Sequence, residues 1–217
     1  MVNNLVISAS SDIGFEFVKN KSLSEEKVIG TYRDQNAKTK IDKFCVHSIF
    51  LDLFDKESVI KFIEYISNER IYWDRILFCP CQPFPYESFF DSNFEDWQKS
   101  FYLNSIYQLE LLHKLYKFRN KNAKVIFFAG GGSNNAVDKF SAYTSAKIHL
   151  TKMVELLDFE NKDITFSILG PGWVNTKNHL LALKHADKNS EKYKTTKKFL
   201  DSPQGATPIE EVIRSIN

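Results

Sequence analysis

The chain has 217 residues, of which 43% are hydrophobic and 26% charged, as in an ordinary globular protein with one sizeable core. A formal net charge of +2 gives no reason to expect nucleic acid or a membrane surface as a partner. No apolar run approaches the ~18 residues of a membrane-spanning helix, and the start lacks a secretory leader. Three cysteines cannot complete a disulfide framework, and Cys79-Pro80-Cys81 lacks the second pair of a zinc site. We therefore expect a single domain over residues 1–217, no metal, and a cytoplasmic location.

Short apolar runs alternate with helical patterns along the whole chain. The runs predicted as strands are 5–7, 27–32, 47–51, 75–78, 124–128 and 164–169. The predicted helices lie at roughly 12–20, 55–68, 94–118, 141–160 and 208–217. Several strands lack polar alternation, which indicates burial on both faces. The pattern predicts an α/β fold with a Rossmann-type doubly wound parallel sheet, whose ligand lies beyond the carboxyl ends of the strands.

The segment after the first strand consists mostly of small and polar residues. Such residues allow a tight turn that brings backbone amides towards a pyrophosphate at a helix N-terminus. The segment has one glycine, so a plain Ser/Asp helix cap remains the alternative. The residues concerned are Ser8, Ala9, Ser10, Ser11, Asp12, Ile13 and Gly14.

The second strand ends at Tyr32-Arg33, and Arg33 lies 19 residues beyond Gly14. At this point of a dinucleotide-binding fold an acidic side chain favours NAD, whereas an arginine can meet the 2′-phosphate of NADP. Arg33 therefore predicts NADP over NAD. An exposed loop arginine, followed by Asp34, is the alternative reading.

The predicted helix at 94–118 carries an inward stripe that contains one polar residue, Asn104. Because an unpaired buried amide costs about 1–3 kcal/mol, Asn104 needs hydrogen-bond partners. It either caps a buried backbone group or holds a water beside a reaction centre. The other members of the stripe are Trp97, Phe101, Leu111 and Leu115.

Tyr143 and Lys147 are the most informative pair in the chain. Four residues apart in a helix, they share a face with Leu150, Val154 and Leu157, so both should turn inward. An inward ammonium requires a partner or a task. Lowering the pKa of the neighbouring phenol is such a task, and the phenol could then exchange a proton with a carbonyl or alcohol oxygen. A chance Tyr-x-x-x-Lys on a surface helix is the alternative.

Together these segments resemble the short-chain dehydrogenase/reductase superfamily in its compact single-domain form, over nearly the whole chain and in the right order. The serine-rich turn is similar to the family's cofactor turn, and Asn104 with Tyr143 and Lys147 matches its catalytic set. Asp52-Leu53 after the third strand resembles its adenine-contacting pair. The segment after the sixth strand resembles the one that borders the nicotinamide; it contains Pro171, Gly172, Val174 and Thr176.

The resemblance implies that hydride passes between nicotinamide and a substrate carbon while Tyr143 transfers the proton. Lys147 would bind the nicotinamide ribose and hold Tyr143 acidic, and Asn104 would anchor a water of the proton relay. Hydride chemistry belongs to the cofactor, and the protein supplies placement and electrostatics. The resemblance also implies a homodimer or homotetramer.

This chain departs from the family pattern at several positions. Ser8 stands where a glycine is usual, and Cys79-Pro80-Cys81-Gln82 replaces the expected Asn-Asn-Ala-Gly segment. Ala129 stands in place of the catalytic serine, and Ser133, on a glycine-rich turn, is a candidate substitute. The chain also stops after 208–217, where relatives continue into a seventh strand.

Residues 177–207 occupy the place of the family's variable substrate lid. A basic lid could meet a phosphorylated substrate, although such a run is more often a solvated helix face. Phe84, Tyr86, Phe89 and Phe90 are candidates for another wall of the pocket. The sequence therefore predicts an NADP-dependent oxidoreductase for a carbonyl/alcohol substrate, with a catalytically impaired scaffold or sensor as the alternative. The lid lysines are Lys177, Lys184, Lys188, Lys192, Lys194, Lys197 and Lys198.

Overall fold

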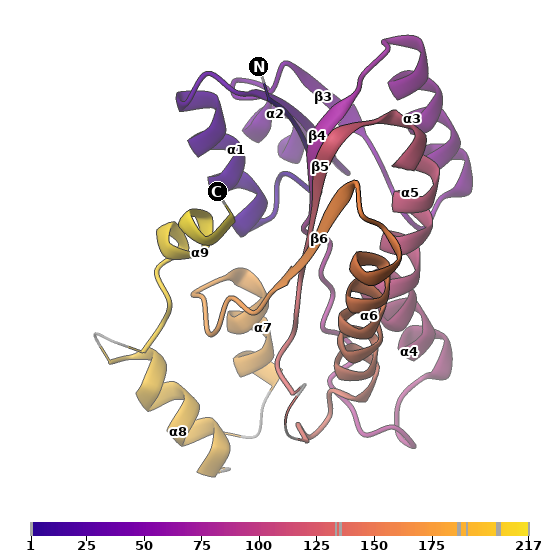
Figure 1. The fold of residues 1–217 in the computed structure, drawn as a ribbon. Helices are drawn as coiled ribbons and strands as arrows, with labels where there is room; N and C mark the ends of the chain where they lie inside the picture. Colours follow the sequence, from indigo (N-terminus) through magenta and orange to yellow (C-terminus); the bar gives the residue numbers. More distant parts are fainter. Residues whose placement is uncertain are drawn as a thin grey trace.

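The computed structural model describes residues 2–132, 134, 136–185, 188–189, 191–202 and 205–216. Six parallel strands form one sheet in the order β3-β2-β1-β4-β5-β6 (Figure 1). The predicted doubly wound sheet is therefore confirmed. The strands are β1 (Asn3–Ile7), β2 (Lys27–Tyr32), β3 (His47–Phe50), β4 (Trp73–Phe78), β5 (Arg119–Phe128) and β6 (Ile164–Leu169).

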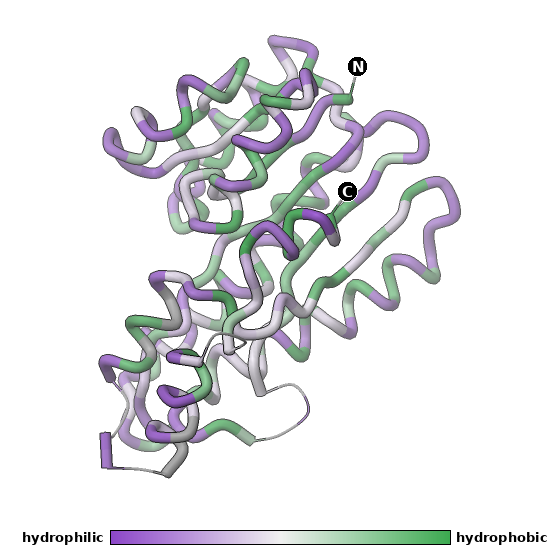
Figure 2. The backbone as a smooth tube through the Cα atoms, turned by 90° about the vertical axis from the view of Figure 1, so that its left-hand side faces the viewer, coloured by the Kyte–Doolittle hydropathy of each residue, from purple (hydrophilic) through white to green (hydrophobic). Residues whose placement is uncertain are grey.

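Helices cover both faces of the sheet, and successive strand residues alternate between the two cores (Figure 1). Leu5 and Ile7 pack with α3 (Lys56–Asn68), α5 (Tyr107–Leu115) and α6 (Ser141–Glu160). Val6, between them, packs with the other layer. That layer consists of α1 (Asp12–Leu23), α2 (Gln35–Ile41) and α9 (Ile209–Ile216). Burial on both faces explains why the strands lack alternation and appear mostly green in Figure 2.

Two helix predictions need correction. The sequence pattern did not predict α2, because this seven-residue helix buries only Ile41. Its start is fixed locally, since the Asp34 carboxylate accepts a hydrogen bond from the Ala37 amide at 2.9 Å. The single helix predicted at 94–118 is interrupted: α4 (Phe94–Phe101) passes into a π-helical turn, η1 (Tyr102–Ile106), before α5 and a final 3-10 turn, η2 (Tyr116–Phe118). Such π-helical turns are frequent at functional sites.

The predicted lid contains two helices, α7 (Lys177–His185) and α8 (Glu191–Leu200). An isolated parallel bridge between Val174 and Thr207 joins the two ends of the lid segment. After the lid, α9 packs on α1. The final helix, which was predicted at 208–217, spans Ile209–Ile216 in the described part of the chain. No described helix is both long and apolar enough to cross a lipid bilayer.

Candidate active site

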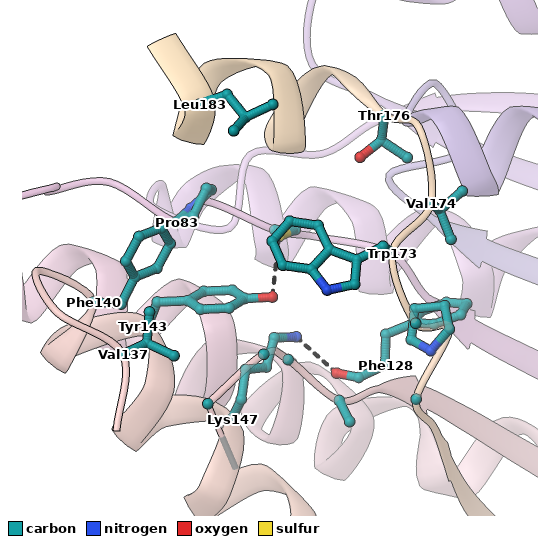
Figure 3. A pocket seen from close by; sticks show the side chains of 18 of the residues that line it. Pro83, Phe128, Val137, Phe140, Tyr143, Lys147, Trp173, Val174, Thr176 and Leu183 are labelled. Carbon is teal, nitrogen blue, oxygen red and sulfur yellow. Dashed lines mark hydrogen bonds between the residues drawn. The ribbon is translucent and has the colours of Figure 1, made fainter. Parts of the chain in front are cut away.

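A cavity of about 960 Å³ opens at the carboxyl ends of β1, β4, β5 and β6 (Figure 3). Each of these strands contributes the segment that follows it, and the start of α6 and parts of α7 and α8 complete the wall. The cavity therefore lies where a doubly wound sheet is expected to hold its ligand.

Tyr143 and Lys147 lie on α6 and both line this cavity. Lys147 is 2% exposed and shares its helix face with buried Leu150 and Val154, so the predicted inward stripe is confirmed. The Lys147 Nζ donates a hydrogen bond to the Phe128 carbonyl oxygen at 2.9 Å and lies 5.9 Å from the centre of the Tyr143 ring. Figure 3 shows the Tyr143 hydroxyl and the Lys147 ammonium directed into one part of the cavity, beside Trp173.

Burial shifts the pKa values of both members of this pair. It raises the pKa of Tyr143 well above its usual value, and the neighbouring Cys81 adds to this shift. Burial also lowers the pKa of Lys147. Desolvation of the phenolate therefore works against the acidification of Tyr143 that was expected from Lys147. Tyr143 is a protonated phenol at neutral pH and can act as a proton donor.

Gly130 makes the close packing of this pair possible, and the sequence reading gave it no role. A Cβ atom on Gly130 would lie 2.7 Å from both Tyr143 Cε1 and Lys147 Cγ. Only a residue without a side chain lets the end of β5 approach the two functional groups so closely. The available signal was the Gly130-Gly131-Gly132 run directly after a buried strand.

The turn after β1 contains a helix cap, and part of the turn lines the cavity. Ser8 takes a left-handed conformation with φ of +59°, which explains why relatives place a glycine there. Ser11 is the N-cap of α1, since its hydroxyl accepts a hydrogen bond from the Gly14 amide at 3.2 Å. Ser11, Asp12 and Ile13 line the cavity, whereas Ser8, Ser10 and Gly14 are not among its lining residues. The α1 N-terminus thus opens into the same space as Tyr143.

The residues predicted to meet the adenosine follow β2 and β3 and do not line the described cavity. Arg33 is exposed directly after β2. The Asp52 carboxylate accepts a hydrogen bond from the Phe54 amide at 3.0 Å, and Leu53 packs against the core. Lys40 brings a second cation to this region. Its Nζ donates a hydrogen bond to the Ser10 carbonyl oxygen at 3.2 Å.

Asn104 is fully buried in η1, and the backbone-capping interpretation is confirmed. Its Oδ1 accepts from the Gln82 amide at 3.1 Å, and its Nδ2 donates to the Gln82 carbonyl oxygen at 2.7 Å. The same Nδ2 donates to the Ser100 carbonyl oxygen at 2.8 Å. Asn104 therefore fixes the segment after β4, although it does not itself line the cavity.

The segments after β5 and β6 complete the site. Ala129 lines the cavity with a methyl group where relatives present a hydroxyl, and Ser133, its predicted substitute, lies outside the described residues. Pro171, Gly172, Val174 and Thr176 all line the cavity, as predicted from their position after β6. Among the described residues no cluster of His, Cys, Asp and Glu could hold a metal ion.

The lid presents mainly apolar and aromatic groups to the cavity. Its lining residues include Leu183, His185 and Tyr193, and the His185 ring stacks on Tyr86 at 5.0 Å between centroids. Of the four aromatic residues predicted after β4, only Tyr86 lines the cavity. The described lid lysines do not line it, which favours the solvated-face interpretation; they are Lys177, Lys184, Lys188, Lys194, Lys197 and Lys198.

A parallel sheet in this order, with a half-buried tyrosine beside a buried lysine at its carboxyl edge, defines a dinucleotide-binding type of α/β protein. The family model described as short chain dehydrogenase matches residues 3–185, and the chain belongs to this family. No curated protein matches the chain.

Solved structures of this family share the fold at low sequence identity. A short chain dehydrogenase/reductase from Saccharomyces cerevisiae is 17% identical with a TM-score of 0.83, covering 96% of this chain and 86% of its own. BdcA in complex with NADPH is 18% identical with a TM-score of 0.80, covering 99% and 85%. A variant of actinorhodin polyketide ketoreductase with NADPH is 16% identical with a TM-score of 0.82, covering 99% and 88%.

Proposed function

We propose that this protein is an NADP-dependent oxidoreductase that reduces a carbonyl compound, or oxidises the matching alcohol, with Tyr143 as the general acid/base. The observation that carries the proposal is the half-buried Tyr143 beside the buried Lys147, a pair that shares one cavity with the N-terminus of α1. A bound nicotinamide supplies the hydride in this chemistry. The chain's own residues position the reactants and move the proton.

The residues present fit a dinucleotide. Backbone amides at the α1 N-terminus suit a pyrophosphate, and Ser11, Asp12 and Ile13 face the cavity. Lys147, buried beside Tyr143, would hold the nicotinamide ribose. Arg33 with Lys40 supports NADP over NAD, because both cations lie near the edge where the adenosine ribose is expected. The NADPH complexes of BdcA and the ketoreductase are consistent with this preference.

The cavity wall favours an uncharged, largely apolar carbonyl compound over a phosphorylated one. Phe140 and Trp173 lie around Tyr143 (Figure 3). Tyr86 also lines the cavity, with its ring 5.3 Å from that of Phe140. An anionic phosphate among these groups would lose its hydration without an exchange of hydrogen bonds. An aryl or alkyl ketone would instead bury apolar surface there.

The electrostatics favour the reductive direction at neutral pH. Because the pKa of Tyr143 is raised by burial, its hydroxyl carries a proton that it can deliver to a carbonyl oxygen. Oxidation of an alcohol needs the phenolate and should therefore require higher pH.

The test is turnover of acetophenone with NADPH, compared between the wild type and Tyr143→Phe. The variant should lose turnover by about a thousandfold, because it lacks the proton donor. Its affinity for NADPH, followed by cofactor fluorescence, should be unchanged. Retained turnover in Tyr143→Phe would refute the assigned role, and glyceraldehyde 3-phosphate as a matched substrate tests the preference for uncharged carbonyls. Arg33→Ala should weaken NADPH and leave NADH unchanged.

Ala129 supports one competing proposal, a family member that binds a dinucleotide without turning over substrate. Its methyl group replaces the hydroxyl that normally orients the substrate oxygen, and losing one such donor costs about 100- to 1,000-fold in rate. An NADPH-dependent rise in melting temperature, with no turnover of any carbonyl probe, would favour this alternative.

A further inference from the structure

Cys81 lies against the hydroxyl of Tyr143, with 3.9 Å between Cys81 Sγ and Tyr143 Oη (dashed line in Figure 3). It comes from the segment after β4, whereas Tyr143 and Lys147 come from α6. Cys81, Tyr143 and Lys147 thus bring a thiol, a phenol and an ammonium to one part of the cavity.

A buried network fixes the backbone on both sides of Cys81. The backbone of Gln82 accepts a hydrogen bond from the Asn104 Nδ2 at 2.7 Å and donates one to the Asn104 Oδ1 at 3.1 Å. The Pro80 carbonyl oxygen accepts from the Gln108 Nε2 at 3.2 Å. Both amides are fully buried, so the thiol is presented from a rigid base.

The cavity lacks the hydroxyl that usually faces the tyrosine, since Ala129 occupies that position among the described residues. We propose that Cys81 supplies the second hydrogen bond to the substrate oxygen, beside that from Tyr143. This inference rests on the proposed reductase function and adds a catalytic residue to it.

The distance suits this role. An oxygen that accepts a hydrogen bond from Tyr143 lies about 2.7 Å from Oη, and it can contact the thiol as well if it sits to one side of both groups, at the apex of a triangle whose base is the 3.9 Å from Oη to Sγ. Cys81 keeps its proton throughout: the S–H bond points at the oxygen as negative charge develops. Tyr143 gives its proton to that oxygen and regains one from solvent. The thiol therefore stabilises charge without being oxidised or alkylated.

The decisive comparison is between Cys81→Ala and Cys81→Ser, both assayed with NADPH and acetophenone. Cys81→Ala should lower kcat by about tenfold, less than the loss of a stronger oxyanion donor, because a thiol is a weak donor. Cys81→Ser should restore kcat to at least the wild-type value, since a hydroxyl is the better donor. Cys45→Ala is the matched control: Cys45 is not among the residues that line the cavity, and its removal should leave kcat within about twofold.

A second readout does not require turnover. Benzamide offers an unreactive carbonyl oxygen, and its binding can be followed through the fluorescence of Trp173, which lines the cavity. Cys81→Ala should weaken benzamide by about threefold or more, the loss of one weak hydrogen bond, and Cys81→Ser should not.

The outcomes separate this proposal from the function on which it rests. Turnover that disappears in Tyr143→Phe but is unchanged in Cys81→Ala would overturn the role of Cys81 alone. Wild-type protein that binds NADPH and benzamide without reducing any ketone would overturn the reductase function. Equal benzamide affinity in the wild type, Cys81→Ala and Cys81→Ser, or no benzamide binding, would overturn the inference for the thiol.

Discussion

Two lysines are buried at opposite ends of the sheet, and they are held in different ways. Lys21, 4% exposed at the end of α1, forms an ion pair with Glu26 at 2.8 Å near the amino ends of the strands. Asn4 and Arg75 donate to the same carboxylate at 2.9 and 3.5 Å. Lys147, 2% exposed at the carboxyl ends, donates instead to a backbone carbonyl and lines a cavity.

The difference distinguishes a lysine with a structural partner from the lysine proposed to act in the site. An ammonium buried against a carboxylate is neutralised by that carboxylate, and the ion pair becomes part of the packing at its end of the sheet. A buried ammonium opposite a neutral carbonyl keeps its charge available to a ligand, and the fold must supply the free energy that holds it there. Burial alone therefore does not identify a catalytic lysine; the chemistry of its partner does.

The largest effect is expected from Lys147→Met. Turnover of acetophenone should fall by about a thousandfold, because the ammonium proposed to hold the nicotinamide ribose is lost. Thermal stability should not fall, because an uncompensated buried charge is removed from an apolar surrounding. Steady-state kinetics and calorimetry on the same preparation check both parts, and a strongly destabilised variant would contradict the functional assignment.

Lys21→Met should show the reverse pattern. The Glu26 carboxylate would lose its closest cation but keep Asn4 and Arg75, so unfolding free energy should fall by about 2 kcal/mol. kcat should remain within about twofold, because the pair lies at the far end of the sheet. Urea denaturation measures the loss, and restoration by Lys21→Met with Glu26→Leu would confirm that the unpaired carboxylate is its cause.

Gly130→Ala tests how closely the backbone after β5 packs against Tyr143 and Lys147. The added methyl group would lie 2.7 Å from Tyr143 and Lys147, so both must shift, and kcat should fall by about 10- to 100-fold. Gly131→Ala is the matched control, because a Cβ there meets nothing within 4 Å. Equal kinetics in the two variants would show that the pair tolerates displacement.

The smallest effect concerns the pH dependence of stability. Burial by itself would raise the pKa of Glu26, but Lys21, Asn4 and Arg75 outweigh it and hold the pKa below its usual value of 4.5. Because the folded-state pKa is depressed, this stabilisation is present above about pH 4.5 and is lost as pH falls through the folded-state value. Unfolding free energy of Glu26→Gln should therefore vary less between about pH 5 and pH 3 than that of the wild type.

Much of the fold could be predicted from the sequence. Buried parallel strands are continuous apolar runs, and each strand can be recognised from its own residues. The inward faces of Tyr143 and Lys147 followed from helical spacing, and the positions of Pro171 and Gly172 from the strand before them. The helix α2 was missed because its stability comes from the Asp34 cap and one buried residue. The π-helical turn contains Asn104, which contacts Gln82 across 22 residues, and helical spacing does not encode such a contact.

The electrostatics of the site were least accessible to sequence. A Tyr-x-x-x-Lys spacing gives the neighbour of a phenol but not the extent of its burial, and here burial raises the pKa of Tyr143. Cys81 was visible only as a departure from the expected segment after β4. Its relation to Tyr143 depends on how two segments 62 residues apart meet across the cavity.

The Asp12 carboxylate, at the first residue of α1, accepts a hydrogen bond from the Lys177 amide at 2.8 Å, across 165 residues of sequence. The Asp12 side chain thus connects the turn expected to bind a pyrophosphate with Lys177, the first residue of the lid. A nucleotide that binds to the turn first would therefore position the lid before the substrate binds. We expect compulsory-order kinetics, with the nucleotide entering first and leaving last, which product-inhibition patterns would reveal.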